Sequence, residues 1–125
     1  MNTREKILSL DQARATAAGI PVTAFVTHLE VLRADHIRAL EAAAADSAPG
    51  KLFLVLTDPP SPLVALEDRA EVDAGLRMVD YVVPAAAGRE PALDAIRPRR
   101  IIEDEEEDCG RTRRLIEHVR SRCAQ

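Results

Sequence analysis

The stretch KLFLVLT at residues 51–57 is a near-continuous apolar run of strand length, and it leads directly into DPPSP at residues 58–62. A strand that is apolar at nearly every position, instead of at alternate ones, is typical of a parallel sheet with helices on both faces. The three prolines exclude regular structure from the second stretch, because each fixes φ and lacks a backbone donor. The sequence therefore predicts a buried parallel strand with a loop at its carboxyl end.

Three other short runs have the composition of strands, and helical patterns separate them. These runs are PVTAFVT at residues 21–27, DYVVP at 80–84 and RRII at 99–102. Strands that alternate with helices predict an α/β fold in which right-handed crossovers connect mainly parallel strands. We expect four parallel strands, near residues 22–27, 51–57, 80–83 and 100–103.

The helices are indicated by apolar residues at helical spacing and by start and stop signals. In LSLDQARATAAG, Ser9 or Asp11 is a candidate N-cap and Gly19 is a candidate stop. Further helices are expected over residues 35–47, 66–79, 89–98 and 111–122, the last of them basic.

Composition restricts the class of protein. The 125 residues are expected to form one domain over residues 1–125. A net charge of −4 and only three aromatic residues argue against nucleic acid or an anionic membrane as the partner. No run is long enough to cross a membrane and the N-terminus has no signal-like apolar core, so we expect a cytoplasmic protein. Cys109 and Cys123 form no CxxC pair and are interpreted as free thiols, and no metal site is predicted.

Ligands of parallel sheets bind beyond the carboxyl ends of the strands, near the point where the strand order reverses. Three segments are expected at that rim: the turn at 28–36, the proline loop at 58–62 and the acidic run EDEEED at 103–108. The turn lies within VLRADHIRAL at 31–40, where a helix N-terminus often binds phosphate, yet Asp35 stands there instead of a glycine.

The chain also resembles a known family. EDRAEVDAGLRMVDYVV at 67–83 resembles a segment of the adenylyltransferase domain of ADP-heptose synthase, within the cytidylyltransferase-like nucleotidyltransferases. KILSLDQA at 6–13, AIRP at 95–98 and RLIEHV at 114–119 are similar to other parts of that domain, in the same order. The resemblance implies a three-layer Rossmann-like nucleotidyltransferase fold, with a four-stranded parallel sheet in the order 3-2-1-4 and the family's fifth strand lost.

The resemblance also implies roles for particular residues. The family's H-x-G-H turn aligns with residues 33–36, which makes Arg33 and His36 the candidate catalytic residues of a degenerate site. Its nucleotide-binding positions fall on His28, Asp35, Thr112 and Arg114. Two other family features are missing, because residues 103–105 replace a Lys-Gly-Gly motif and the loop after the second strand is too short to carry the family's lysine.

The acidic residues at the rim allow more than one interpretation. Asp35 is read as the N-cap of its helix, with magnesium binding as the alternative. The run 103–108 is read as a solvated loop, with a divalent-metal or cationic-ligand site as the alternative, and the arginines at 111, 113 and 114 are expected to offset its charge. His28 is a candidate ligand-facing residue, whereas His118 is expected at the surface and Asp58 is expected to cap the proline loop.

Two functions follow from these patterns. The first is a degenerate nucleotidyltransferase without transferase activity, retained as a ligand-binding or interaction module. The alternative is an active enzyme that moves a nucleotidyl group from a nucleoside triphosphate to a sugar phosphate or similar acceptor, with release of pyrophosphate, and only then is Mg²⁺ expected. A nucleotide or sugar phosphate is the expected ligand. A second copy of the chain is a candidate partner, because the fourth strand is left as an open edge of the sheet.

Overall fold

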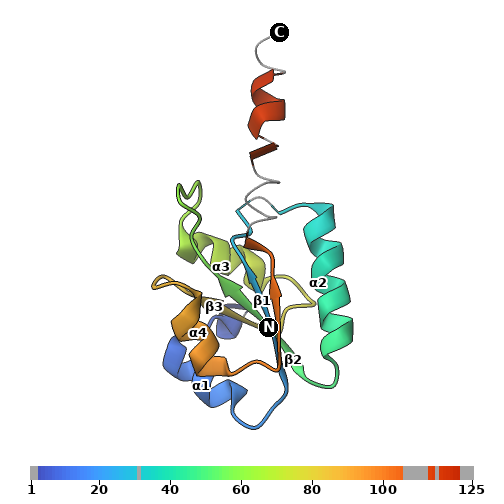
Figure 1. The fold of residues 1–125 in the computed structure, drawn as a ribbon, viewed down its shortest axis with the longest axis vertical. Coiled ribbons are helices and arrows are strands. Elements are labelled where there is room, and N and C mark those ends of the chain that lie inside the picture. The colour runs from blue at the N-terminus through green and yellow to red at the C-terminus, as the bar shows by residue number, and fades with distance from the viewer. Residues whose placement is uncertain (1–2, 31, 106–112, 115, 122–125) are drawn as a thin grey trace.

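The structure is a computed structural model that describes residues 3–30, 32–105, 113–114 and 116–121. Its elements alternate between helix and strand (Figure 1). They are η1 (Thr3–Lys6), α1 (Leu10–Ala17), β1 (Val22–Thr27), α2 (Ala34–Ser47), β2 (Lys51–Leu56), α3 (Leu66–Ala74), β3 (Tyr81–Pro84), α4 (Arg89–Ile96) and β4 (Arg100–Glu103). Residues 113–114 and 116–121 are helical as well, and this C-terminal helical segment projects from the carboxyl end of the sheet.

The four strands form one sheet in the order β3-β2-β1-β4, and every neighbouring pair is parallel. This confirms the predicted α/β class, the parallel pairing and the order 3-2-1-4. The order reverses at β1, since the chain moves outward through β2 and β3 on one side and returns to place β4 on the other. The carboxyl ends of β1 and β4 therefore flank the place where a ligand of such a sheet is expected.

Helices cover both faces of the sheet, in three layers (Figure 1). Side chains alternate between the two faces along β1, so that Val22, Ala24 and Val26 join the core beneath α1 and α4. Phe25 joins the opposite core, which lies beneath α2 and α3. The strands β1 and β2 are buried along almost their whole length, as the apolar runs in the sequence predicted.

The first helix begins as expected. Ser9 is its N-cap: its Oγ accepts a hydrogen bond of 3.2 Å from the backbone N–H of Gln12, and the Gln12 side chain accepts one of 2.9 Å from the N–H of Ser9. This reciprocal pair satisfies donors that a helix start otherwise leaves without partners. The stop at Gly19 is consistent with its φ of 78°.

Two helices are shorter than predicted. The helix expected over residues 66–79 ends at Ala74, with Gly75 as its C-cap. The Nζ of Lys6 then donates to the carbonyl oxygens of Leu76 (3.1 Å) and Val79 (3.0 Å), which follow the helix. Those carbonyls are therefore satisfied without a continuing helix. The helix expected over 89–98 ends at Ile96, where Arg97 takes a left-handed conformation with φ of 46°. Among the described residues, no helix combines the length and the apolar character needed to cross a membrane.

Candidate functional site at the carboxyl ends of the strands

A side-chain hydrogen bond crosses the point where the strand order reverses. The hydroxyl of Thr27, at the end of β1, donates to Oδ2 of Asp104, directly after β4, at 3.1 Å. The backbone N–H of Asp104 also donates to the carbonyl of Val26 at 2.8 Å. Asp104 is only 5% exposed, so the residue is buried next to the carboxyl ends of the two strands. The protein's own acid thus occupies the position at which this type of sheet usually receives a ligand.

The residues beside Asp104 are also bonded to the rim. Thr57, after β2, donates from Oγ1 to Oε2 of Glu105 at 2.7 Å. Nη1 of Arg89, at the start of α4, lies 2.8 Å from Oε1 of Glu103 and 3.3 Å from Oε1 of Glu105. The expectation of a solvated loop is therefore wrong for Asp104, which is buried, whereas Glu103 is the last residue of β4 and its side chain is 60% exposed. Residues 106–108 lie outside the described part of the chain.

Part of the positive charge next to these acids comes from Arg89, to which the sequence patterns gave no role. Arg89 pairs with Glu103 and Glu105, whereas Arg113 and Arg114 are exposed in the C-terminal helical segment. Arg111 lies outside the described residues. Arg89 was missed because a single arginine at a predicted helix start gives no signal of a long-range ion pair.

His28 lies just after β1 and is turned toward β2. Its Nδ1 is 3.0 Å from both the carbonyl oxygen and the hydroxyl oxygen of Thr57, and the residue is 7% exposed. Because a hydroxyl has one proton and Thr57 gives it to Glu105, Nδ1 of His28 acts as the donor. His28 thus links the ends of β1 and β2, and it also lines a pocket.

Arg69 of α3 joins the loops that follow β1 and β2, although the sequence reading assigned it no role. Its Nη1 donates to the carbonyls of His28 (2.6 Å) and Thr57 (2.9 Å), and its Nε donates to the carbonyl of Val64 (3.1 Å). Its Nη2 donates to the carboxylate of Asp58. The residue is 2% exposed, and these acceptors compensate for the burial of its charge. Asp58, predicted to cap the proline loop, instead anchors the loop to α3 through Arg69.

The turn before α2 brings three of the predicted site residues together. The N-cap is Arg33, in an extended conformation, so the prediction that Asp35 caps the helix is wrong. The N–H of Arg33 donates to Nδ1 of His36 at 3.1 Å, and this ring fills the capping role from within the first turn. Oδ1 of Asp35 instead lies 3.5 Å from Nε of Arg33. His36 is 1% exposed, and the Arg33 guanidinium is already next to an acid at the helix N-terminus.

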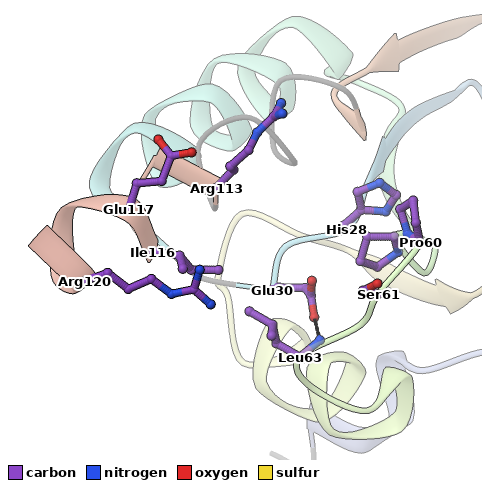
Figure 2. Close-up of a pocket in the computed structure, with 10 residues that line it drawn as sticks. His28, Glu30, Pro60, Ser61, Leu63, Arg113, Ile116, Glu117 and Arg120 are labelled. Atoms are coloured by element: carbon purple, nitrogen blue, oxygen red, sulfur yellow. Dashed lines mark hydrogen bonds between the residues drawn. The ribbon is translucent and has the colours of Figure 1, made fainter.

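A pocket of about 470 Å³ lies next to this rim (Figure 2). Ile116 and Arg120 reach from the C-terminal helical segment toward Glu30 and Leu63. Glu30 accepts hydrogen bonds from the N–H groups of Leu63 and Val64, so its carboxylate is engaged by the proline loop. The lining is His28, Glu30, Pro59, Pro60, Ser61, Leu63, Arg113, Ile116, Glu117 and Arg120. The prolines, Leu63 and Ile116 give it an apolar wall.

The predicted site residues do not all gather in one place. Arg33, Asp35 and His36 share the start of α2, whereas His28 lines the pocket and Arg114 is exposed outside its lining. Thr112 lies outside the described residues. His118 is exposed, as predicted. Within the described part of the chain, no group of three or more His, Cys, Asp or Glu side chains is arranged to hold a metal ion.

Comparison with known proteins supports the fold. No known protein family and no curated protein matches the sequence. The structure is similar to the crystal structure of the lipopolysaccharide core biosynthesis protein from Thermoplasma volcanium GSS1. The two chains superimpose with a TM-score of 0.58 at 16% sequence identity, over 66% of this chain and 73% of the other. At this identity the likeness establishes a shared Rossmann-like α/β architecture.

Proposed function

We propose that this chain is a nucleotidyltransferase-like protein that does not transfer nucleotidyl groups and instead binds a ligand at its carboxyl rim. The observation that carries the proposal is the Thr27–Asp104 hydrogen bond between the carboxyl ends of β1 and β4. A nucleotide bound at these strand ends would have to displace the bond or lie against a buried carboxylate.

The chemistry of nucleotidyl transfer explains why this matters. The reaction attacks the α-phosphate of a nucleoside triphosphate and expels pyrophosphate, so the protein must supply positive charge and N–H donors to phosphate oxygens. A carboxylate about 5 Å from a phosphate oxygen opposes binding by about 3 kcal/mol at an effective dielectric of about 20. Asp104 is buried at the ends of β1 and β4, and Asp35 lies at the helix N-terminus, so an acidic side chain stands at both places that would hold phosphate.

The pocket next to the rim gives the protein a different binding site. Its apolar wall and its volume of about 470 Å³ suit a small molecule with an apolar body. Arg120 reaches into the cavity from the C-terminal helical segment and offers a polar contact at one side. We therefore place the ligand-binding function in this pocket and not at the ends of β1 and β4.

Calorimetric titration with ATP and CTP, with and without Mg²⁺, tests the proposal, together with an assay for pyrophosphate release with a sugar 1-phosphate. We expect no pyrophosphate and no saturable nucleotide binding in the micromolar range. Screening of small apolar and amphipathic compounds should then give ligands whose binding is lost in Leu63→Asp and kept in Val72→Asp, a matched change on the exposed surface of α3. Turnover by the wild-type protein would overturn the proposal.

One observation favours the alternative of an active nucleotidyltransferase. Arg33 and His36 lie side by side at the N-terminus of α2, where a guanidinium and a helix start can both bind phosphate. If the enzyme is active, Mg²⁺ would bridge the rim acids to the triphosphate, and Arg33→His would abolish pyrophosphate release. The two functions are therefore distinguished by the wild-type assay alone.

A further inference from the structure

The two edges of the sheet differ in how far their backbone groups are paired. At the β3 edge, Ile7 forms a parallel bridge with Val82, and the N–H of Leu8 donates to the carbonyl of Val82 at 2.9 Å. At the other edge, β4 pairs with β1, and no described residue pairs with its outer side. An open strand edge presents unpaired backbone donors and acceptors to another chain.

The β4 edge is also uncovered by the helices. Both α2 and α4 pack over β1 and β2, and β4 stands between the two helix layers at the open side of the sheet (Figure 1). As a result Ile101 is 45% exposed in the middle of the strand, whereas the aliphatic side chains of β1 and β2 are buried. The edge therefore combines open backbone groups with an exposed apolar side chain.

Charge along β4 specifies the direction of pairing. Arg99 and Arg100 lie at its amino end and Glu103 lies at its carboxyl end. If two copies of β4 run antiparallel, the basic end of each lies next to the acidic end of the other, whatever the detailed register. If they run parallel, like charges meet. Antiparallel pairing is also the arrangement that a twofold axis perpendicular to the sheet produces.

We propose that a second copy of this chain binds at β4, so that the two β4 strands pair antiparallel about a twofold axis and join both sheets into one. The present partners of the charged residues do not prevent this. Nη1 of Arg100 lies 3.4 Å from Oδ2 of Asp46, and Oε1 of Glu103 lies 2.8 Å from Nη1 of Arg89. The four side chains are 32–63% exposed. Exposed ion pairs contribute little, so exchanging them for pairs with the second copy has a small cost.

Sedimentation velocity of the full chain across low to high micromolar concentration is the first test. The wild type is expected to shift from monomer to dimer, and Ile101→Lys is expected to raise the dimer dissociation constant at least about tenfold. Val72→Lys is the matched control, because Val72 is also exposed and apolar but lies on α3. A wild type that stays monomeric throughout, or equal effects of the two lysine variants, would overturn the proposal.

A charge exchange provides the second test and does not depend on Ile101. Glu103→Arg makes all the charged residues at 99–103 basic, and the double variant Arg99→Glu, Arg100→Glu makes them all acidic. Each alone is expected to be monomeric, and a mixture of the two is expected to form a one-to-one dimer that salt weakens. Far-UV circular dichroism checks that each variant is folded. Folded variants that self-associate like the wild type, or that fail to associate when mixed, would contradict antiparallel β4 pairing.

Discussion

The hydroxyl of Thr27 donates to a buried carboxylate oxygen of Asp104 at 3.1 Å, across the two strand ends between which a ligand of this sheet type would lie. Without the Thr27 hydroxyl, the buried carboxylate of Asp104 loses one of its hydrogen-bond donors. Thr27→Val is therefore expected to lower the free energy of unfolding by about 1–3 kcal/mol. Urea denaturation followed by circular dichroism measures this change.

Thr23→Val is the matched control for Thr27→Val. Thr23 is 1% exposed and lies on the same face of β1, and no hydrogen bond from its side chain to a carboxylate is present among the described residues. Its replacement is expected to change the free energy of unfolding by less than about 1 kcal/mol. Equal losses in the two variants would show that the Thr27–Asp104 bond does not stabilise the fold.

Arg69 gives a prediction about the loops of the rim. In Arg69→Met, the carbonyls of His28 and Thr57 lose a buried donor and Asp58 loses its cationic partner. The expected loss is about 1–3 kcal/mol, because buried carbonyls lose a donor. The Asp58 side chain is 43% exposed, so water can replace Arg69 there. The exposed Arg77 is the control, and Arg77→Met is expected to stay within about 0.5 kcal/mol of the wild type. Thermal unfolding that is the same for both variants would refute a structural role for Arg69.

Lys6 gives a prediction about the end of α3. Its Nζ donates to the carbonyls of Leu76 and Val79, which follow the helix, so Lys6→Met leaves two part-buried acceptors without this donor. We expect a loss of about 1–2 kcal/mol in the free energy of unfolding. The chain has one other lysine, Lys51, which is exposed, and Lys51→Met is expected to be nearly neutral. Hydrogen exchange at residues 75–80 should also accelerate in Lys6→Met only.

The strands could be predicted to within about one residue because each is a short apolar run between turn signals. Val22–Thr27 and Arg100–Glu103 coincide with the predicted ranges. Their order followed from the resemblance of residues 67–83, since local patterns do not determine which strands become neighbours. The end of α3 was mispredicted because Gly75, its C-cap, was taken as an interior residue of the helix. The bonds from Lys6 to the carbonyls that follow could not be predicted, since Lys6 lies about seventy residues earlier in the sequence.

The rim network could not be predicted in the same way, since its bonds join residues far apart in sequence. The run 103–108 was predicted to be a solvated loop because six consecutive acids are usually exposed. Asp104 is nevertheless buried, and its carboxylate accepts a hydrogen bond from Thr27. A signal for Arg69 was present. Arg69 and Asp73 occur at the spacing of Leu66, Ala70 and Ala74, the buried face of α3. Charged residues on an apolar helix face indicate a buried polar network.

The turn before α2 offers a way to reverse the change that we propose prevents nucleotide binding. Arg33→His with Asp35→Gly removes a carboxylate from the helix N-terminus, where it would repel a phosphate bound to the N–H groups. Nucleotide binding measured by calorimetry should improve by about 1–3 kcal/mol, and no more, because Asp104 and its acidic neighbours remain at the rim.

Catalysis should not return in that double variant, because residues 103–105 are acidic where the resembling family has Lys-Gly-Gly. Arg33→Lys with Asp35→Glu is the control, since it keeps both charges and should leave nucleotide binding unchanged. An active enzyme predicts the opposite result, with wild-type pyrophosphate release that collapses when Arg33 is replaced by histidine. Unchanged binding in Arg33→His with Asp35→Gly would show that the turn is not where nucleotide is excluded, and would leave the Thr27–Asp104 bond as the cause.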